Sequence, residues 1–360
     1  MPSANRIVLA SAGSGKTTTL VKEACGDVGT RSALITYTLN GRGELSNKAY
    51  EHFGAIPPNV TISTWYTFVL THLVRPYQNH LYVPRVSAIN FSRVPRTLRV
   101  PKAATSRYFF SNKGTVWRDR VTDFACQVIE RTGGLPVKRM EQIFGRIYID
   151  EAQDLAGWDL ELIEHLMRSR TEIVLVGDIR QATYSTNDNP KNKAYWGENI
   201  LEKFVEWEKM GLAAIEHQSH SHRCIQTICD FADLLFPDRP KTTSRNVVVT
   251  GHEGVFLVSA SELDPYYWTF LPQPLRYDRR TDVVRGKPLN FGEAKGLTFE
   301  RTIIYPTGPL LKYLKTGRLA DAGKAIAKTY VAVTRARQSV AIVVPEGFKS
   351  AQLPLFTFHV

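Results

Sequence analysis

The sequence contains few cysteines and no long apolar run. Its four cysteines, Cys25, Cys126, Cys224 and Cys229, form no CxxC pair. This spacing argues against a zinc site and is typical of reduced, buried thiols. No apolar run is long enough to span a membrane, and the first predicted strand begins too close to Met1 to leave room for a signal peptide. We therefore expect a cytoplasmic protein with no membrane partner.

Acidic residues are also scarce relative to basic ones. Against 46 lysines and arginines there are 34 acidic residues, which gives a formal net charge of +12. Such a charge favours a polyanionic partner, although a generic basic protein would have the same balance. There is no internal repeat, heptad run or low-complexity tract. The 360 residues, 43% of them hydrophobic, are enough to bury one large core or two medium ones.

A glycine-bearing loop follows the first apolar run, Ile7–Ala10. The loop reads SAGSGKTT and leads into a helix-compatible stretch, which is the context of a phosphate-binding loop. Two glycines would let the backbone approach phosphate oxygens, a lysine could reach the β- and γ-phosphates, and a threonine could ligate Mg²⁺. We therefore expect ATP and Mg²⁺ as cofactors. The expected binding residues are Ala12, Gly13, Ser14, Gly15, Lys16, Thr17 and Thr18.

Two further apolar strands end in polar residues suited to nucleotide chemistry. Ile147–Ile149 runs into Asp150 and Glu151. Asp150 would hold Mg²⁺ through its water shell, and Glu151 could accept a proton from the attacking water. Ile173–Asp178 is followed by Gln181, which is placed to sense the γ-phosphate.

The alternation of short strands with helical stretches predicts a parallel sheet whose ligands gather at the carboxyl ends of its strands. Two more strands are expected at Ser32–Tyr37 and Val60–Ser63. Tyr37, Thr64 and Trp65 would then lie at the functional edge. Aromatic rings there could stack on bases, or they could equally be packing residues.

The stretch from Pro84 to Arg120 is basic and contains a single acid, Asp119. Prolines break any long helix there, and aromatic residues lie between the basic ones. This composition predicts an inserted basic subdomain. Contact with nucleic-acid phosphates and a merely solvated face are both open interpretations. The candidate contacts are Arg93, Arg96 and Arg99.

The ordered set ASAGSGKT, YIDEAQD, VGDxxQxxY, SHR, AKGLTF and YVAVTRAR resembles that of the UvrD/Rep-type superfamily 1 DNA helicases. The resemblance covers most of the chain and implies an α/β fold with two RecA-like P-loop NTPase domains built on parallel sheets. In the family, ATP binds between these domains and single-stranded DNA crosses both. The domains expected here are 1–75 with 121–211, a small basic insertion at 76–120, and a second RecA-like domain at 212–360.

The resemblance also implies roles for residues outside the phosphate loop. Arg223 and Arg335 match the two arginines that reach the γ-phosphate from the second domain, where guanidinium groups stabilise the transferring phosphoryl group. His222 stands where the family often has an adenine-stacking tyrosine, and an ordinary surface histidine is an equal alternative. Tyr37 and Tyr184 match aromatic residues that handle bases.

The chain also departs from the family pattern. Thr186 replaces a tryptophan that usually follows the residue equivalent to Tyr184. A large insertion that the family carries between the positions of Arg223 and Asn290 has no room here. The resemblance thus implies a near-minimal motor.

Three functions follow from these patterns. The first is an ATP-dependent translocase or helicase on single-stranded DNA, 3′ to 5′ by resemblance, with RNA not excluded. The second is a nucleic-acid-sensing ATPase subunit that regulates a partner such as a nuclease. The third is a P-loop kinase, which the paired arginines in a second domain disfavour.

Overall fold

The computed structural model describes residues 5–95, 100–102 and 105–358. The chain forms two compact units, one containing the residues up to Leu9 and Lys16–His217, the other containing Ala10–Gly15 and the residues from Gln218 onwards. Each unit contains a largely parallel β-sheet flanked by helices, which confirms the predicted α/β class. Among the described residues, no helix is long and apolar enough to cross a membrane.

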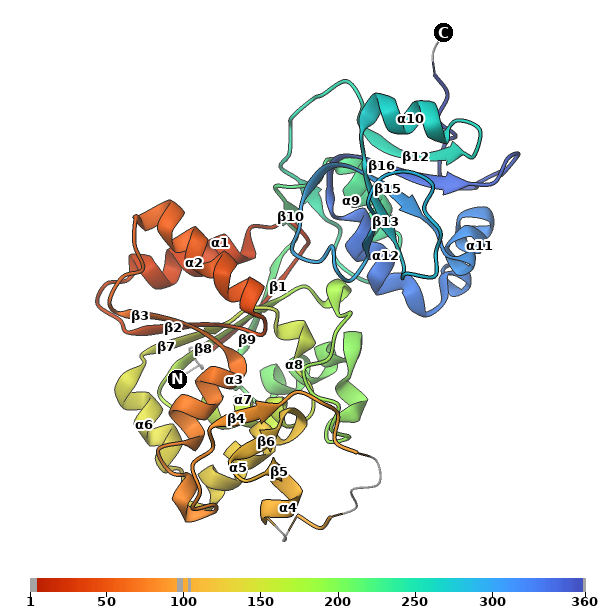
Figure 1. Ribbon diagram of the computed structural model, residues 1–360. Helices are drawn as coiled ribbons and strands as arrows, with labels where there is room; N and C mark the ends of the chain where they lie inside the picture. The colour runs from red at the N-terminus through yellow and green to blue at the C-terminus, as the bar shows by residue number, and fades with distance from the viewer. Residues whose placement is uncertain (1–4, 96–99, 103–104, 359–360) are drawn as a thin grey trace. The chain divides into compact units, whose positions relative to one another are not determined.

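The sheet of the first unit has the strand order β3-β2-β7-β8-β1-β9 (Figure 1). Its strands are β1 (Arg6–Ala10), β2 (Ser32–Thr36), β3 (Val60–Thr64), β7 (Arg146–Ile149), β8 (Glu172–Gly177) and β9 (Ala214–Gln218). The β1–β8, β8–β7, β7–β2 and β2–β3 pairs are all parallel. Because these pairs are parallel, the carboxyl ends of β1, β7 and β8 lie at the same edge of the sheet.

Helices cover both faces of this sheet, as its continuous apolar strands require. The helices are α1 (Lys16–Gly26), α2 (Leu39–Phe53), α3 (Trp65–Phe68), α5 (Val121–Arg131), α6 (Leu135–Ile143), α7 (Trp158–Met167) and α8 (Ile200–Lys209). Alternate strand residues point to opposite faces. Tyr148 packs with the core under α1 and α2, while Ile147 and Ile149 pack with the core under α5 to α8. In Figure 1, α1 and α2 lie on one side of the strands and α5 and α6 on the other.

The basic stretch folds against the first unit. Its elements are β4 (Ala88–Asn90), α4 (Thr105–Phe109), β5 (Phe110–Asn112) and β6 (Thr115–Trp117), and its strands form a small sheet in the order β4-β6-β5. Phe109 and Phe110 are buried in the same core as α5, and the Phe110 ring stacks on Tyr82 at 3.9 Å between centroids. These two aromatic residues therefore attach the insertion to the core and are not available to bases.

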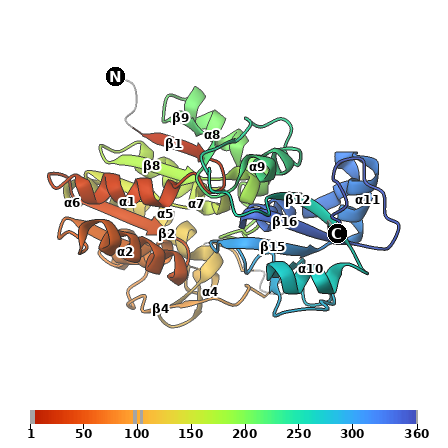
Figure 2. The same cartoon turned by 90° about the horizontal axis from the view of Figure 1, so that it is seen from above.

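The sheet of the second unit has the strand order β12-β16-β15-β13-β14, with parallel pairing throughout. Its strands are β12 (Gly254–Ser259), β13 (Gln273–Arg276), β14 (Leu289–Asn290), β15 (Phe299–Tyr305) and β16 (Ala336–Val344). Its helices are α9 (Gln226–Asp233), α10 (Leu263–Phe270), α11 (Gly308–Thr316) and α12 (Ile326–Val333). Residues of α9, α11 and α12 share one core, and residues of α10 belong to another. Figure 2 shows α10 on one side of β12, β15 and β16.

The unit boundaries differ from the predicted ones in two places. The predicted boundary lies between residues 211 and 212, but β9 is the edge strand of the first sheet, so the second unit resumes at Gln218. The loop Ala10–Gly15 belongs to the second unit, because its hydrogen bonds are made there. Both differences depend on contacts between segments more than 200 residues apart, which local sequence patterns do not report.

A buried histidine predicts acid sensitivity of the second unit. His252 is 7% exposed, stacks on Phe270 at 3.6 Å and shares a hydrogen bond with the Tyr266 hydroxyl. Burial, aided by the charge of Arg301, lowers the pKa of His252 from 6.5 to about 4. Between these pH values the unfolded chain binds more protons than the folded one, so the free energy of unfolding falls as the pH falls.

We expect His252→Phe to remove this dependence, which amounts to about 2 kcal/mol between pH 7 and pH 5. Urea unfolding of the two proteins across this pH range measures the difference. The exposed His52 gives the matched control, His52→Gln. Equal pH slopes in the wild type and His252→Phe would contradict the assignment.

Candidate active site

The phosphate-binding loop turns where its glycines allow it. Gly13 and Gly15 have φ of 75° and 81°, in the left-handed region that favours glycine. Gly13 is required for a second reason, since a β-carbon there would lie 2.6 Å from the Arg223 Cβ and the Ser221 Oγ. The Ser11 amide donates to the Gln218 carbonyl at 3.0 Å, and the His222 amide donates to the Gly13 carbonyl at 2.8 Å. The loop is thus held by residues 218–222, which follow it far along the chain.

The polar groups of this loop are only partly satisfied by hydrogen bonds. The Ala12 amide donates to the Tyr330 hydroxyl at 3.4 Å. The Ser14 hydroxyl is buried and has no hydrogen-bond partner among the described residues. An orphaned buried hydroxyl in a glycine loop is consistent with a phosphate oxygen as its missing partner.

The first helix and strand β7 bring together a hydroxyl and a carboxylate. Lys16 and Thr17 begin α1, where Thr18 follows them, and Asp150 comes directly after β7. The Thr17 Oγ1 donates to the Asp150 Oδ2 at 3.0 Å. A hydroxyl and a carboxylate oxygen are ligands that Mg²⁺ accepts. The residues present therefore fit a Mg²⁺ ion.

Burial and charge act together on the neighbouring acids. Asp150 is 5% exposed, and burial together with the adjacent Glu151 charge raises its pKa to about 6. Lys16 and the Thr17 hydroxyl oppose this shift. The Lys16 Nζ lies 3.9 Å from the Glu151 Oε1. The site thus contains more negative charge than Lys16 alone compensates, as a site for a divalent cation requires.

Glu151 is held in an uncommon backbone conformation, with φ of 59°. Its side chain is hydrogen-bonded to the Gln153 Nε2. Non-glycine residues in the left-handed region persist only where the surrounding structure fixes them, and such residues cluster at functional sites.

Gln153 connects this acid to the end of β8. Its Oε1 accepts the Asp178 amide at 3.0 Å, and the Gln181 Nε2 donates to the Asp178 Oδ2 at 2.7 Å. Gly177 allows the close approach, since a β-carbon there would overlap Gln153. Glu151 and Gln181 are therefore linked through two intervening residues, Gln153 and Asp178.

The arginines of the second unit converge on one residue, Thr334. The Arg223 Nη1 donates to the Thr334 carbonyl at 3.1 Å, and the Arg335 Nη2 lies 3.3 Å from the Thr334 hydroxyl. Arg335 is 2% exposed and also donates to the carbonyls of Val331 and Leu297, at 2.9 and 3.3 Å. His222 is exposed, and its ring contacts His220 edge to face.

The predicted nucleic-acid residues fall into buried and exposed groups. Trp65 is fully buried and Tyr37 half-buried, and both donate to the carboxylate of Asp159, at 3.0 and 3.4 Å. Trp65 therefore presents no face to a base. Thr64 bonds the Thr67 hydroxyl at 2.9 Å. Tyr184 is 60% exposed.

Of the predicted arginines, Arg93 is exposed over 84% of its side chain. Arg96 and Arg99 lie outside the described residues. The structure thus describes one of the three.

A family model described as an AAA domain matches residues 1–187, more than half of the chain. The chain belongs to the AAA-domain family. The matched range includes the phosphate loop, both acids and Gln181. A comparison with curated proteins gives no match.

Among solved structures, this AAA-domain chain is similar to the PRRSV helicase, at 15% identity and a TM-score of 0.47, with 95% of this chain and 53% of that chain covered. It is similar to arterivirus nonstructural protein 10, a helicase, at 16% identity and a TM-score of 0.47, with 95% and 60% covered. A complex of that helicase with DNA gives 15% identity, a TM-score of 0.47, and 96% and 62% covered. The chain therefore spans 53–62% of the length of these structures.

Two polar residues of this AAA-domain chain were missed by sequence reasoning. Gln153 lies inside the quoted YIDEAQD motif, so its position was the only available signal. Asp159 is fully buried, and its burial raises the pKa of its carboxyl. It accepts hydrogen bonds from Tyr37, Trp65 and the Thr186 hydroxyl. No spacing rule in the sequence indicates that these segments meet at one carboxylate.

Proposed function

We propose that this chain is an ATP-hydrolysing motor that moves along single-stranded DNA, in the 3′ to 5′ direction that the UvrD/Rep resemblance implies. The observation that carries the proposal is the pairing of Thr17 with Asp150 beside Lys16 and Glu151. It supports nucleotide hydrolysis because the arrangement combines a phosphate-binding amine, a candidate Mg²⁺ site and a candidate general base.

In this proposal each side chain has one task. Lys16 and the amides of Gly13 and Gly15 would bind the phosphates of ATP, and Thr17 and Asp150 would hold Mg²⁺. When bound, Mg²⁺ would neutralise charge on the β- and γ-phosphates. Glu151 would accept the proton of the attacking water, oriented by its bond to Gln153. Gln181 would report the γ-phosphate to Asp178 and the segment that follows.

Arg223 and Arg335 would supply positive charge to the γ-phosphate, the role that the UvrD/Rep resemblance implies. In that family, ATP drives the opening and closing of two domains, and such a cycle is the basis of translocation.

The second unit contains no extra subdomain between Arg223 and Asn290 within the described residues, which form α9, α10 and strands of the unit itself. This observation favours a variant of the proposal, in which the chain translocates or senses single strands and a protein partner, such as a nuclease, uses the result. Surfaces that hold a duplex ahead of the junction lie largely on insertions in the UvrD/Rep family.

We expect strong stimulation of ATP hydrolysis by single-stranded oligonucleotides and weak strand displacement by the monomer. Phosphate release with and without DNA and RNA oligonucleotides measures the first. Single-turnover displacement on 3′-tailed and 5′-tailed duplexes measures the second and the direction. Hydrolysis that no nucleic acid stimulates would contradict the motor, and processive displacement by the monomer would remove the need for a partner.

A further inference from the structure

The segment that follows Tyr184 ends in an exposed carboxylate held between two arginines. The Asp188 Oδ2 lies 3.2 Å from the Arg93 Nε and 3.2 Å from the Arg118 Nη2. Arg93 comes from the loop after β4 and Arg118 from the end of β6, so both belong to the basic insertion. Asp188, by contrast, lies in the loop that follows β8 and Gln181.

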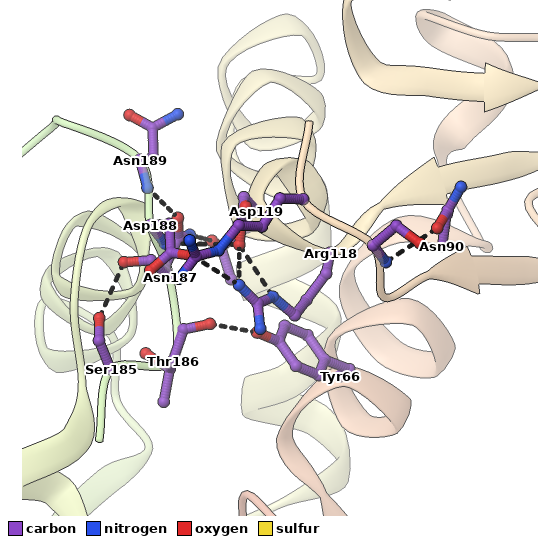
Figure 3. Close-up of polar contacts among 12 residues, drawn as sticks. Tyr66, Asn90, Arg118, Asp119, Ser185, Thr186, Asn187, Asp188 and Asn189 are labelled. Atoms are coloured by element: carbon purple, nitrogen blue, oxygen red, sulfur yellow. Dashed lines mark hydrogen bonds and ion pairs between the residues drawn. The ribbon is translucent and has the colours of Figure 1, made fainter. Parts of the chain in front are cut away.

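Asp188 is fixed by its neighbours in the chain. The Thr186 amide donates to the Asp154 carbonyl at 3.0 Å, and the Thr186 carbonyl accepts the Tyr66 hydroxyl at 2.6 Å. Asn187 is fully buried, and its Nδ2 donates to the Thr122 hydroxyl at 3.4 Å. Figure 3 shows this segment against Tyr66, Arg118 and Asp119. The Asp188 carboxylate is therefore presented by a tethered backbone and not by a free loop.

Arg118 is oriented by Asp119, which also accepts the Asp188 amide at 3.4 Å. Its Nε donates to the Asp119 Oδ1 at 2.9 Å, and Asp119 is itself 6% exposed. The Arg118 side chain is 15% exposed, whereas that of Arg93 is 84% exposed. The Arg118 guanidinium is thus held in position, whereas the Arg93 guanidinium can move. Two such groups are suited to binding an oxygen of a phosphate group.

An exposed aromatic ring lies close to Arg93 in sequence. Phe91 is 63% exposed and packs edge to face on Tyr66, with 6.1 Å between ring centroids. Tyr66 also donates to Thr186, two residues before Asp188. An exposed ring close to paired arginines is the combination that binds a base and its phosphate in single strands.

We propose that Phe91, Arg93 and Arg118 form a binding subsite for one nucleotide of a single strand, and that Asp188 occupies its phosphate position in the ligand-free protein. This inference rests on the proposed function, from which the class of ligand, a single-stranded nucleic acid, is taken. When the strand binds, a phosphate oxygen replaces the Asp188 carboxylate oxygen beside the two arginines. Asp188 therefore competes with the strand for this position. The Thr186 amide, close to Asp188 in the chain, donates to the carbonyl of Asp154, which lies three residues beyond Glu151.

The test measures affinity for a fluorescein-labelled oligothymidylate and, separately, for inorganic polyphosphate. Asp188→Asn keeps the shape of the side chain and removes its charge. Because binding of the ligand no longer competes with an exposed ion pair, we expect about two- to five-fold tighter binding of both ligands. Glu198→Gln makes the same charge change at an exposed position of the first unit and controls for net charge.

Two further variants identify the subsite. Arg93→Ala should abolish most of the gain caused by Asp188→Asn and lower the salt slope for the oligonucleotide by about 0.7. Phe91→Ala should weaken binding of oligothymidylate but not of polyphosphate, because only the former has a base. Thermal unfolding verifies that each variant is folded.

The inference is overturned if Asp188→Asn binds no more tightly than Glu198→Gln, or if its gain persists unchanged with Arg93→Ala. If oligonucleotides stimulate hydrolysis while Asp188→Asn has no effect, the inference fails and the proposed function stands. If Asp188→Asn improves only polyphosphate binding and oligonucleotides do not bind, the nucleotide subsite and the nucleic-acid function both fail, and only an anion site remains.

Discussion

Glu151→Gln should bind ATP with near-normal affinity and lose hydrolysis by about 10²- to 10⁴-fold, the usual contribution of a general base. The substitution keeps the size of the side chain and its ability to accept a hydrogen bond from Gln153, but it cannot take a proton from water. Lys16, 3.9 Å away, loses a neighbouring negative charge and remains available to phosphate. The loss should therefore appear in turnover and not in binding.

Phosphate release under saturating ATP, together with equilibrium binding of a fluorescent ATP analogue, separates these two effects. Glu198→Gln serves again as an exposed control with the same change of charge. A folded Glu151→Gln protein that hydrolyses ATP within about tenfold of the wild type would place the base elsewhere.

The phosphate loop and the two acids could be predicted because their signals are local. A buried parallel strand appears in the sequence as an apolar run, and glycine and lysine at fixed spacing define the loop after it. The predicted strand at Val60–Ser63 differs from β3 only by its last residue, Thr64. The placement of Glu151 near Lys16 then follows because the carboxyl ends of β7 and β1 lie at the same edge of the sheet.

Residues whose roles depend on distant contacts could not be predicted in this way. Trp65 follows a strand, as a base-contacting residue would, but a hydrogen bond to Asp159, 94 residues away, draws it into the core. The ion pairs of Asp188 with Arg93 and Arg118 likewise require that a loop after β8 meet the basic insertion. Similarly, no local pattern in the sequence indicates that β9 is the edge strand of the first sheet.

Arg335 and Arg223 match the same role in the helicase resemblance, yet the structure predicts different consequences of removing them. Arg335 is buried, and its guanidinium donates to the carbonyls of Val331 and Leu297. Arg335→Ala would remove the buried hydrogen bond to Val331, at about 1–3 kcal/mol, and the less buried one to Leu297. The Arg223 side chain is half-buried and donates to the Thr334 carbonyl, so its removal should cost little stability.

We expect both alanine variants to lower turnover by about 10³-fold or more, as the loss of an arginine that stabilises phosphoryl transfer does. Only Arg335→Ala should also lower the midpoint of thermal unfolding, by several degrees. Arg335→Lys keeps the charge but not the planar fork, so it should recover little turnover. These measurements are made well below the unfolding midpoint, with turnover and KM determined separately at saturating oligonucleotide.

The pattern of the two losses identifies what each arginine does. A folded Arg335→Ala protein with normal turnover would restrict Arg335 to holding the end of α12 and would leave Arg223 as the arginine that acts on the γ-phosphate. Equal loss of turnover in both variants, with loss of stability in one, would mean that Arg335 exchanges a backbone carbonyl for phosphate when ATP is hydrolysed. In that case the bonds to Val331 and Leu297 hold the guanidinium in position until phosphate replaces one of these carbonyls.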